Sequence, residues 1–331
     1  MTLDEMANNL GVSKSTVSRA LSGKGRIGKE TRERILSFAR EQGALEETDK
    51  PAGLVSTCNI GVVLPADAYA NRTPYFQDCL LGICEVSSLM KYNVLVATGI
   101  AHDPSSIRDL VENGKVDGII LTRSMEGDKA VQYLTDIHFP VGMTGVCGYD
   151  EVIQVDIDNK AASENLTTLL IGRGYKKFAL IVEDLAYQVN QSRYDGFCNA
   201  LLKNGISKQS QCFYTGALEM EFLDTVISDL MIQKVECIIC GDDVICSSVM
   251  SRLQADGYRI PKDIAIPSLY NSPSLSCFSP AITTVSVSVR QIGNMIGKQM
   301  INYLQGNEYD KKTMMDYEIL FRKSTNRVRA E

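Results

Sequence analysis

The sequence predicts an α/β protein in which a small N-terminal helical domain precedes two doubly wound lobes, each built on a parallel sheet. Three observations predict this architecture. The 331 residues exceed what one hydrophobic core normally serves. Short apolar runs alternate with amphipathic stretches from residue 59 onward, whereas the first 43 residues show helical patterns alone. Basic residues are concentrated in this first part of a chain whose net charge is −6.

The composition is that of a packed globular protein. Hydrophobic residues make up 44% of the chain and charged residues 22%, and no apolar run approaches the ~18 residues of a membrane span, so we expect no membrane association. The N-terminus is acidic where a secretory signal would be basic and then apolar, so we expect a cytoplasmic protein. The 10 cysteines lack the spacing of a disulfide framework, which agrees with a reducing compartment.

Catalytic and metal chemistry find little support in the sequence. Cys237 and Cys240 form a C-x-x-C in the apolar run VECIIC, but residues three apart on a strand point to opposite faces. Neither of the 2 histidines, His102 and His138, has the spacing of a catalytic set or a metal pair. No glycine-rich phosphate loop follows a strand. We therefore predict no enzyme activity, no metal and no cofactor.

The first 43 residues have the pattern of a helix-turn-helix. Thr2 and Glu5 form a capping-box pattern before a helix of about residues 3–10, and Gly11 allows the turn that ends it. A second helix follows this turn, and a third, at roughly residues 29–42, completes a small core.

Charge and side-chain size on this domain predict that it binds nucleic acid. Residues 13–34 contain seven basic and two acidic side chains, whereas the chain after residue 42 has a net charge of −9. The outer face of the second helix presents small hydroxyls and an arginine, which can approach phosphates and base edges closely. We predict that duplex DNA is contacted by Lys14, Ser15, Thr16, Ser18, Arg19, Ser22, Lys24 and Arg26.

The remaining chain alternates predicted strands with predicted helices. The strands are the apolar runs NIGVVLP, NVLVATG, VDGIILT, VIQVDID, KFALIVE, CFYTG, VECIICG and DIAIPSL. The helices between them lie near residues 75–91, 104–113, 128–137, 159–173, 191–204, 220–231 and 244–256. Strands this continuously apolar are buried on both faces, which is typical of parallel sheets covered by helices. The number of units predicts two lobes with a ligand cleft between them, beyond the carboxyl ends of the strands.

The run GVSKSTVSRALSGKGRIGKETRERI resembles the N-terminal signature of the lactose repressor (LacI/GalR) family of bacterial transcription regulators. The resemblance extends over the body through KVDGIIL, VDIDNKAASENLTTLLIGRGYKKFALI, RYDGF, GYRIPKDIAI, ITTV and ILFRKST. It implies a body like a type I periplasmic binding protein, a homodimer on a pseudo-palindromic operator, and repression controlled by a small-molecule effector. It also implies that Lys14, Ser15 and Arg19 face base edges. Thr16 and Ser18 would hold phosphates.

The resemblance implies domain boundaries as well. The helix-turn-helix covers residues 1–43, a linker covers 44–58, and the two-lobed body covers 59–331. Three crossings between the lobes are implied, near Asp158, at 284–289 and at 307–314. The expected first lobe comprises about residues 59–158 and 289–307, and the second about 159–284 and 314–331.

Matching positions imply an effector site. Its members are aromatic, basic and polar side chains expected in the cleft: Tyr75, Phe76, Arg193, Asp242, Asp243, Tyr270 and Asn271. The family's sugar-reading acidic residues are replaced, because Gly145 and the pair Tyr270-Asn271 stand in their places. The resemblance implies a sugar-like small-molecule effector, whereas this neutral rim with one arginine would also suit a less hydroxyl-rich or an anionic ligand. Loss of effector control is the alternative.

The linker departs from the family pattern. In the family it is a basic hinge helix that inserts a leucine pair into the minor groove. Here residues 43–54 contain three acidic residues and one basic residue, with Pro51 and Gly53 opposing a helix. We expect a flexible linker and little insertion by Leu54. The alternative function is therefore a solute-binding or sensor protein of the same body fold whose DNA binding is weak or lost.

Overall fold

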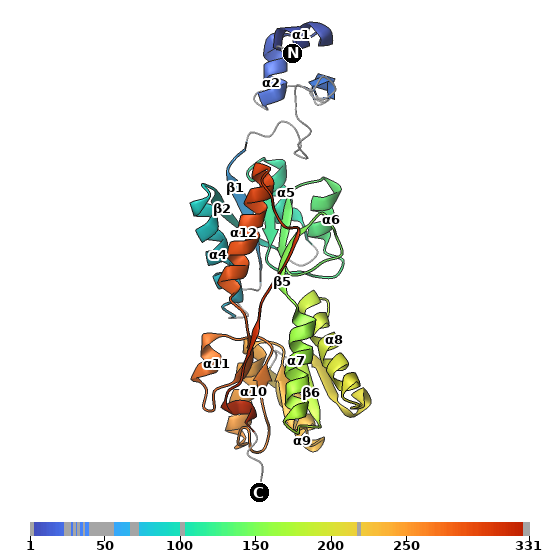
Figure 1. Ribbon diagram of the computed structural model, residues 1–331, viewed down its shortest axis with the longest axis vertical. Coiled ribbons are helices and arrows are strands. Elements are labelled where there is room, and N and C mark those ends of the chain that lie inside the picture. The colour runs from blue at the N-terminus through green and yellow to red at the C-terminus, as the bar shows by residue number, and fades with distance from the viewer. Residues whose placement is uncertain are drawn as a thin grey trace.

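The protein is elongated, with its helical head at one end and two α/β lobes below it (Figure 1). A computed structural model describes residues 3–22, 28, 31, 34, 35, 37–39, 56–66, 73–99, 103–216 and 220–326. The predictions for Thr2, Lys24, Arg26, His102 and the linker residues 44–54 concern residues outside this part of the chain. No helix within it is long and apolar enough to cross a bilayer.

The head begins with two helices joined by a tight turn. Helix α1 spans Leu3–Leu10 and α2 spans Lys14–Ser22. Gly11 takes φ +64° in the turn, a left-handed conformation that favours glycine. Residues 31, 34, 35 and 37–39 are helical. The core of the head consists of small and branched side chains, namely Met6, Ala7, Val17, Ala20, Ile35 and Ala39.

The first lobe contains a six-stranded parallel sheet in the order β11-β5-β4-β3-β1-β2. Its strands are β1 (Asn59–Pro65), β2 (Asn93–Gly99), β3 (Gly118–Leu121), β4 (Val141–Thr144), β5 (Ile153–Ile157) and β11 (Lys312–Met315). Helices α4 (Tyr75–Leu89) and α12 (Val289–Gln305) pack on one face, while α5 (Ser105–Glu112) and α6 (Lys129–Asp136) pack on the other. Both faces of the sheet are covered, so the inner strands β1, β3 and β4 are buried along almost their whole length, whereas the edge strands β2 and β11 keep exposed residues.

The second lobe repeats this plan with the strand order β12-β10-β9-β8-β6-β7. Its strands are β6 (Phe178–Val182), β7 (Cys212–Thr215), β8 (Cys237–Cys240), β9 (Pro267–Ser268), β10 (Thr283–Ser286) and β12 (Glu318–Leu320). Its helices are α7 (Asn159–Gly172), α8 (Gln188–Lys203), α9 (Met220–Ile232), α10 (Asp243–Ala255), α11 (Pro273–Cys277), η1 (Lys208–Ser210) and η2 (Lys323–Thr325). Strand β12 is antiparallel to β10.

The two cysteines of the C-x-x-C occupy opposite faces of the second sheet. Cys237 belongs to the core beneath α7 and α8, and Cys240 belongs to the core beneath α9 and α10. Burial raises the pKa of both thiols well above its usual value. Among the residues described, no group of three or more His, Cys, Asp or Glu could hold a metal ion.

The chain crosses between the lobes three times. It leaves the first sheet after β5, returns to it between β10 and α12, and leaves it again between β11 and β12. This third crossing, at residues 316–317, lies later than the expected 307–314. The reason is that residues 312–315 first add a parallel strand beside β5, with Met315 opposite Ile157.

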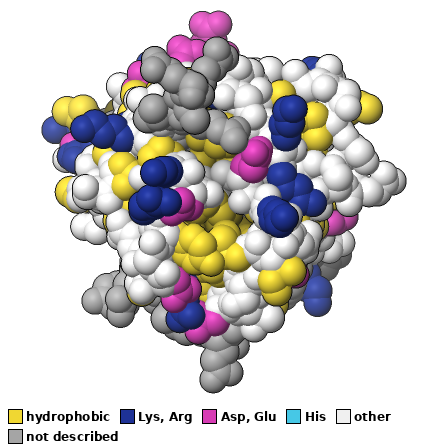
Figure 2. All heavy atoms as spheres, turned by 90° about the horizontal axis from the view of Figure 1, so that it is seen from below, with side chains coloured by type: hydrophobic (Ala, Val, Ile, Leu, Met, Phe, Trp, Pro, Cys, Tyr) yellow, Lys and Arg dark blue, Asp and Glu magenta, His cyan; other side chains and the backbone are white. Residues whose placement is uncertain are grey.

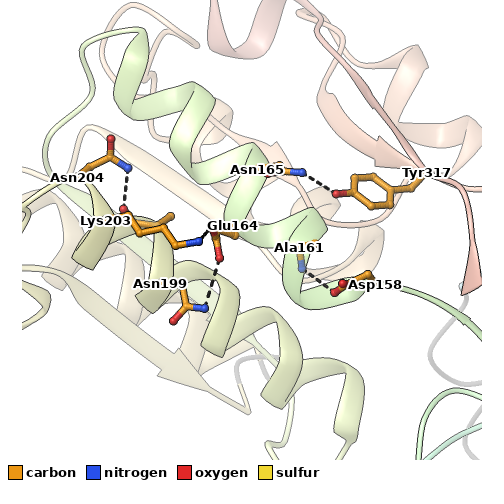
Figure 3. Close-up of polar contacts among 9 residues, drawn as sticks. Asp158, Ala161, Glu164, Asn165, Asn199, Lys203, Asn204 and Tyr317 are labelled. Atoms are coloured by element: carbon orange, nitrogen blue, oxygen red, sulfur yellow. Dashed lines mark hydrogen bonds and ion pairs between the residues drawn. The ribbon is translucent and has the colours of Figure 1, made fainter.

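Polar side chains hold the crossings to α7 (Figure 3). Asp158 caps this helix immediately after the first crossing, since its Oδ1 accepts a hydrogen bond from the Ala161 backbone N–H at 2.8 Å. Asn165, one turn further on, donates from Nδ2 to the hydroxyl of Tyr317 at 2.7 Å. Tyr317 belongs to the third crossing, so two of the three connections share one helix.

Candidate functional site

A cavity of about 150 Å³ lies between the two lobes. Its first-lobe wall comes from the start of α4, the segments after β3 and β4, and the end of β5. Its second-lobe wall comes from the segment after β6, the inner face of α8, the start of α10 and the segment after β9. These are mainly carboxyl ends of parallel strands, where such folds bind ligands.

Aromatic rings from both lobes meet on one side of this cavity. Tyr75 and Phe76 occupy the first turn of α4, with ring centroids 5.3 Å apart at 86°. Tyr270 follows β9 in the other lobe, and its ring lies 6.0 Å from that of Tyr75 at 73°. Burial raises the pKa of both tyrosines, so their hydroxyls remain neutral donors and acceptors. All three residues were expected in the cleft from the sequence, and all three line the cavity.

Arg193 projects from α8 into the cavity with an unused donor. Its Nε is buried and has no hydrogen-bond partner among the described residues. Desolvation by burial lowers the pKa of the guanidinium, while the nearby carboxylates of Asp242 and Asp156 raise it. Neither carboxylate forms an ion pair with Arg193. A buried donor without a partner costs about 1–3 kcal/mol, and an acceptor on a ligand would remove this cost.

Of the two neighbouring aspartates, only one reaches the cavity. Asp242 lines it and also caps α10, accepting a hydrogen bond from the Ile245 backbone N–H at 2.8 Å. Asp243 is buried at 4% exposure away from the lining, and its Oδ1 has no hydrogen-bond partner among the described residues. The match to the family's strand-end pair placed both aspartates in the site but required only one of them to touch the ligand. Asp242 is the one that lines the cavity, and the assignment of Asp243 to the cavity wall is corrected. Asp243 is the first residue of α10 and lies close enough to Tyr270 for its carboxylate to raise the pKa of that hydroxyl, after the larger effect of burial.

Asn271 is also absent from the cavity lining, contrary to expectation. Its Oδ1 accepts hydrogen bonds from the hydroxyl of Thr284 at 3.0 Å and from an Arg322 guanidinium nitrogen at 3.1 Å. These bonds tie the segment after β9 to the neighbouring strand β10. The side chain is therefore turned toward the sheet, and Tyr270 alone of this pair faces the cavity.

Acidic groups that the sequence analysis did not select line the cavity. Asp156 near the end of β5 and Glu183 after β6 join Asp242 on its wall. The expectation of a neutral rim with one arginine is wrong, because these carboxylates and a second arginine, Arg123, also line the cavity. Asp156, the one ionisable residue in the run VIQVDI, was the available signal, since an ionisable residue in a buried strand is rare.

Asp156 is held firmly in place. Its carboxylate accepts hydrogen bonds from the Ile157 backbone N–H at 2.8 Å and from Asn159 Nδ2 at 3.1 Å. Burial nevertheless raises the pKa of Asp156 to about 6, against the opposing effects of these bonds and of Arg193. Gly145, by contrast, takes φ +130°, and a Cβ there would lie 2.8 Å from Cβ of Ser124. Strand β5 therefore contributes a carboxylate to the cavity wall, from Asp156, whereas position 145 contributes no side chain.

The two lobes are bonded to each other beside the cavity. The Glu126 backbone N–H donates to the Ala186 carbonyl at 2.9 Å, and the Gln188 backbone N–H donates to the Ser124 carbonyl at 3.2 Å. Arg123 lies over the ring of Tyr187, 4.4 Å from its centroid. The segments after β3 and β6 thus close one side of the cleft, which no pattern in the sequence indicated.

The head presents its predicted DNA-binding residues outward. Lys14, Ser15, Ser18 and Arg19 are exposed, and Thr16 is half-buried. The hydroxyl of Ser13, just before α2, is hydrogen-bonded to the hydroxyl of Ser15 at 2.8 Å and to that of Thr16 at 2.7 Å. The Lys14 ammonium forms an ion pair with Asp4 at 2.6 Å. The side chain of Ser22 is outside the described part of the structure.

The opposite end of the molecule carries charges of both signs among the residues that the structure describes (Figure 2). Seen end-on from below, basic and acidic side chains are interspersed around hydrophobic ones (Figure 2). A face of mixed sign gives little attraction for a phosphate backbone. This distribution agrees with the separation of a basic head from an acidic body in the sequence.

Comparison with known proteins gives matches over both parts of the chain. Residues 57–322 match the family of periplasmic binding proteins and sugar binding domain of LacI family. Residues 2–43 match the bacterial regulatory proteins of the lacI family. The HTH-type transcriptional regulator RegA of Clostridium saccharobutylicum is 25% identical over 98% of this chain and 99% of its own. MalR of Staphylococcus xylosus, also an HTH-type transcriptional regulator, is 26% identical over 99% of each chain. A solved complex of the transcriptional regulator CelR with cellobiose shares the fold at a TM-score of 0.74, with 22% identity over 98% of this chain and 99% of that one.

Proposed function

This chain belongs to the LacI family of bacterial regulatory proteins and is a DNA-binding transcriptional regulator, and from that premise we propose that it is a repressor whose operator affinity is set by a small molecule bound between its lobes. The head would bind the operator in the cytoplasm. The effector would change the arrangement of the lobes and thereby the spacing of two heads.

The single observation that supports this proposal most strongly is the cavity that spans both lobes. Tyr75 belongs to one lobe and Tyr270 and Arg193 belong to the other, so a ligand that contacts all three favours the closed arrangement. The unused Nε donor of Arg193 supplies a reason for such a ligand to bind. A ligand that prefers one arrangement of the lobes shifts the population toward it, and this links the cavity to the DNA-binding head.

We further propose that a homodimer binds a pseudo-palindromic operator. A single head offers few contacts, since α2 has nine residues, and two half-sites double the number of phosphate and base contacts. Lys14, Ser15 and Arg19 would face base edges, with Thr16 and Ser18 at phosphates. Lys24 and Arg26 would add phosphate contacts beyond α2.

DNA binding is tested with Arg19→Ala and a matched arginine of the body. Arg259 is exposed and lies in the second lobe, where it pairs with Asp263. Fluorescence anisotropy with a selected operator should show a loss of about 1–3 kcal/mol for Arg19→Ala and none for Arg259→Ala. Equal affinity of the intact chain for operator and random duplexes would instead favour a sensor with lost DNA specificity.

Effector control is tested with Arg193→Ala. A compound that changes operator affinity of the wild type should lose this effect in the variant, whereas the affinity of the unliganded variant for DNA should stay the same. A screen of sugars, nucleosides and small acids by thermal shift supplies the compound. An effector that acts equally on Arg193→Ala would place its site outside the cavity.

A further inference from the structure

A second cavity, of about 380 Å³, lies in the second lobe between α8, η1 and the edge strand β7. All the residues of its wall belong to the range 103–216, which the structure describes without a gap. None of them lines the cavity between the lobes. The wall is made of three aromatic side chains, a lysine, two glutamines and a cysteine, namely Tyr194, Phe197, Phe213, Lys208, Gln209, Gln211 and Cys212.

Aromatic rings form the apolar part of this second cavity. The rings of Tyr194 and Phe213 lie 4.3 Å apart between centroids, at an angle of 44°. Phe197 is buried at 2% exposure and packs edge-on against Phe178, 6.5 Å between centroids. Ring surfaces of this kind gain most from a planar aromatic ligand, because offset and edge-to-face contacts between rings add to the burial of apolar area.

The charge at the rim of this cavity is positive. Lys208 is exposed, and its ammonium nitrogen lies 4.5 Å from the centroid of the Tyr194 ring. A hydrogen bond with Tyr194 raises the pKa of Lys208, so the ammonium stays charged at neutral pH. No carboxylate belongs to the described wall of this cavity. A ligand that carries a carboxylate beside its ring therefore meets a charge of opposite sign, whereas an amine is repelled.

The two glutamines differ in what they offer a ligand. The amide of Gln211 is engaged, since its Oε1 accepts from the Phe178 backbone N–H and its Nε2 donates to the Ser210 hydroxyl, both at 2.6 Å. The Oε1 of Gln209 accepts a hydrogen bond from the Ser207 hydroxyl at 3.1 Å. The NH₂ of Gln209 is thus the amide group left to donate, and a carboxylate oxygen is a suitable acceptor.

We propose that this cavity is a second small-molecule site and that it binds a small aromatic carboxylate. The ring of the ligand packs against Tyr194 and Phe213, and its carboxylate is held by Lys208 and Gln209. The site goes beyond the function proposed above, because it is separate from the cavity between the lobes. Both cavities nevertheless use α8, since Arg193 lines one and Tyr194, the next residue, lines the other.

The test compares probes of the same shape and different charge on the full chain. The acids are phenylacetate and indole-3-acetate, the neutral partners are their amides, and the cationic partners are phenethylamine and tryptamine. Cyclohexylacetate keeps the carboxylate and lacks the planar ring. Saturation-transfer NMR titration suits ligands of millimolar affinity. The acids should bind about threefold to fivefold more tightly than the amides, which is the contribution of one exposed ion pair, and the amines should bind most weakly.

Two variants separate the charge from the ring. Lys208→Gln keeps a polar side chain at an exposed position and should remove the preference for acid over amide. Its control is Lys203→Gln, because Lys203 is an exposed lysine at the end of α8 that pairs with Glu164 outside the wall of this cavity (Figure 3). Phe213→Leu keeps an apolar side chain and removes the ring. It should weaken acid and amide alike, by about threefold to tenfold, and should leave cyclohexylacetate nearly unchanged.

Arg193→Ala decides which cavity holds the acid. Because Arg193 lines only the cavity between the lobes, this variant should bind the acids as the wild type does. Loss of acid binding in Arg193→Ala, with Lys208→Gln unaffected, would place the acid between the lobes and overturn the inference. Equal binding of acid, amide and amine, or no binding of either acid at millimolar concentration, overturns it as well. The proposed function is tested separately, by operator binding and by the response to an effector.

Discussion

Substitution of Gly82 by alanine should destabilise the first lobe strongly. Gly82 lies in the middle of α4 where this helix crosses α12, and a Cβ there would lie 2.1 Å from the carbonyl oxygen of Arg290 and 2.9 Å from the backbone nitrogen of Asn294. Close C···O contacts in proteins are about 3.3 Å, so the helices must separate by roughly 1 Å. The obstructing atoms are backbone atoms, and no change of rotamer can relieve the contact.

The expected magnitude follows from two opposing effects. Overpacking of this kind costs about 1–3 kcal/mol or more, whereas alanine gains roughly 0.5–1 kcal/mol over glycine inside a helix. We expect a net loss of about 1–2 kcal/mol, or a fall in unfolding temperature of about 2–8 °C for a lobe of this size. Because α4 begins with Tyr75 and Phe76, the separation should also displace the aromatic wall of the cavity.

Gly172 provides the matched control. It is the last residue of α7, and no atom lies within 4 Å of the position that its Cβ would occupy. Gly172→Ala should therefore raise stability by about 0.4–1 kcal/mol, through the unfolded chain. The chain has 14 tyrosines and no tryptophan, so far-UV circular dichroism is the suitable measurement. Unfolding of Gly82→Ala at or above the wild-type temperature would refute the close approach of α4 and α12.

Three further outcomes follow from the cleft and the head. Gln188→Pro removes the N–H that donates to the Ser124 carbonyl at the first position of α8, where proline is tolerated. We expect a larger radius of gyration in small-angle scattering, while Gln188→Ala, which keeps the N–H, should match the wild type. Asp4→Asn frees Lys14 from its ion pair and should strengthen operator binding about threefold at low salt, with stability changed by less than about 1 kcal/mol. Unchanged or weaker binding would contradict a DNA contact by Lys14. Because the pKa of Asp156 is raised to about 6 in the folded chain, the folded state holds more protons than the unfolded state between about pH 4 and pH 6, and stability falls as the pH rises through this interval. The unfolding temperature of Asp156→Asn relative to wild type should therefore increase from about pH 4 to about pH 7, and a pH-independent difference would show that Asp156 ionises normally.

The sequence by itself determined the features that depend on neighbours along the chain. Alternating apolar runs predicted the strands β1, β2, β3, β5 and β6 and the helices between them, and the structure confirms two parallel-sheet lobes. The turn at Gly11 and the basic excess of residues 13–34 predicted the head. Residue-by-residue resemblance also selected Tyr75, Phe76 and Arg193, which all line the cavity.

Only the tertiary structure decided which side chains face the ligand space. Strand β4 was not predicted because VGMT is short and contains Gly142, whose lack of a side chain matters only against α12, where a Cβ would lie 3.1 Å from Ile296. Residues 312–315 form a strand only because β5 offers them a parallel edge. Asp156 and Arg193 are 37 positions apart in the sequence and approach each other only after the chain crosses between lobes. The spacing of apolar residues along one helix or strand predicts which of its faces is buried. Which charged residues surround the cavity depends instead on which distant segments the fold brings together.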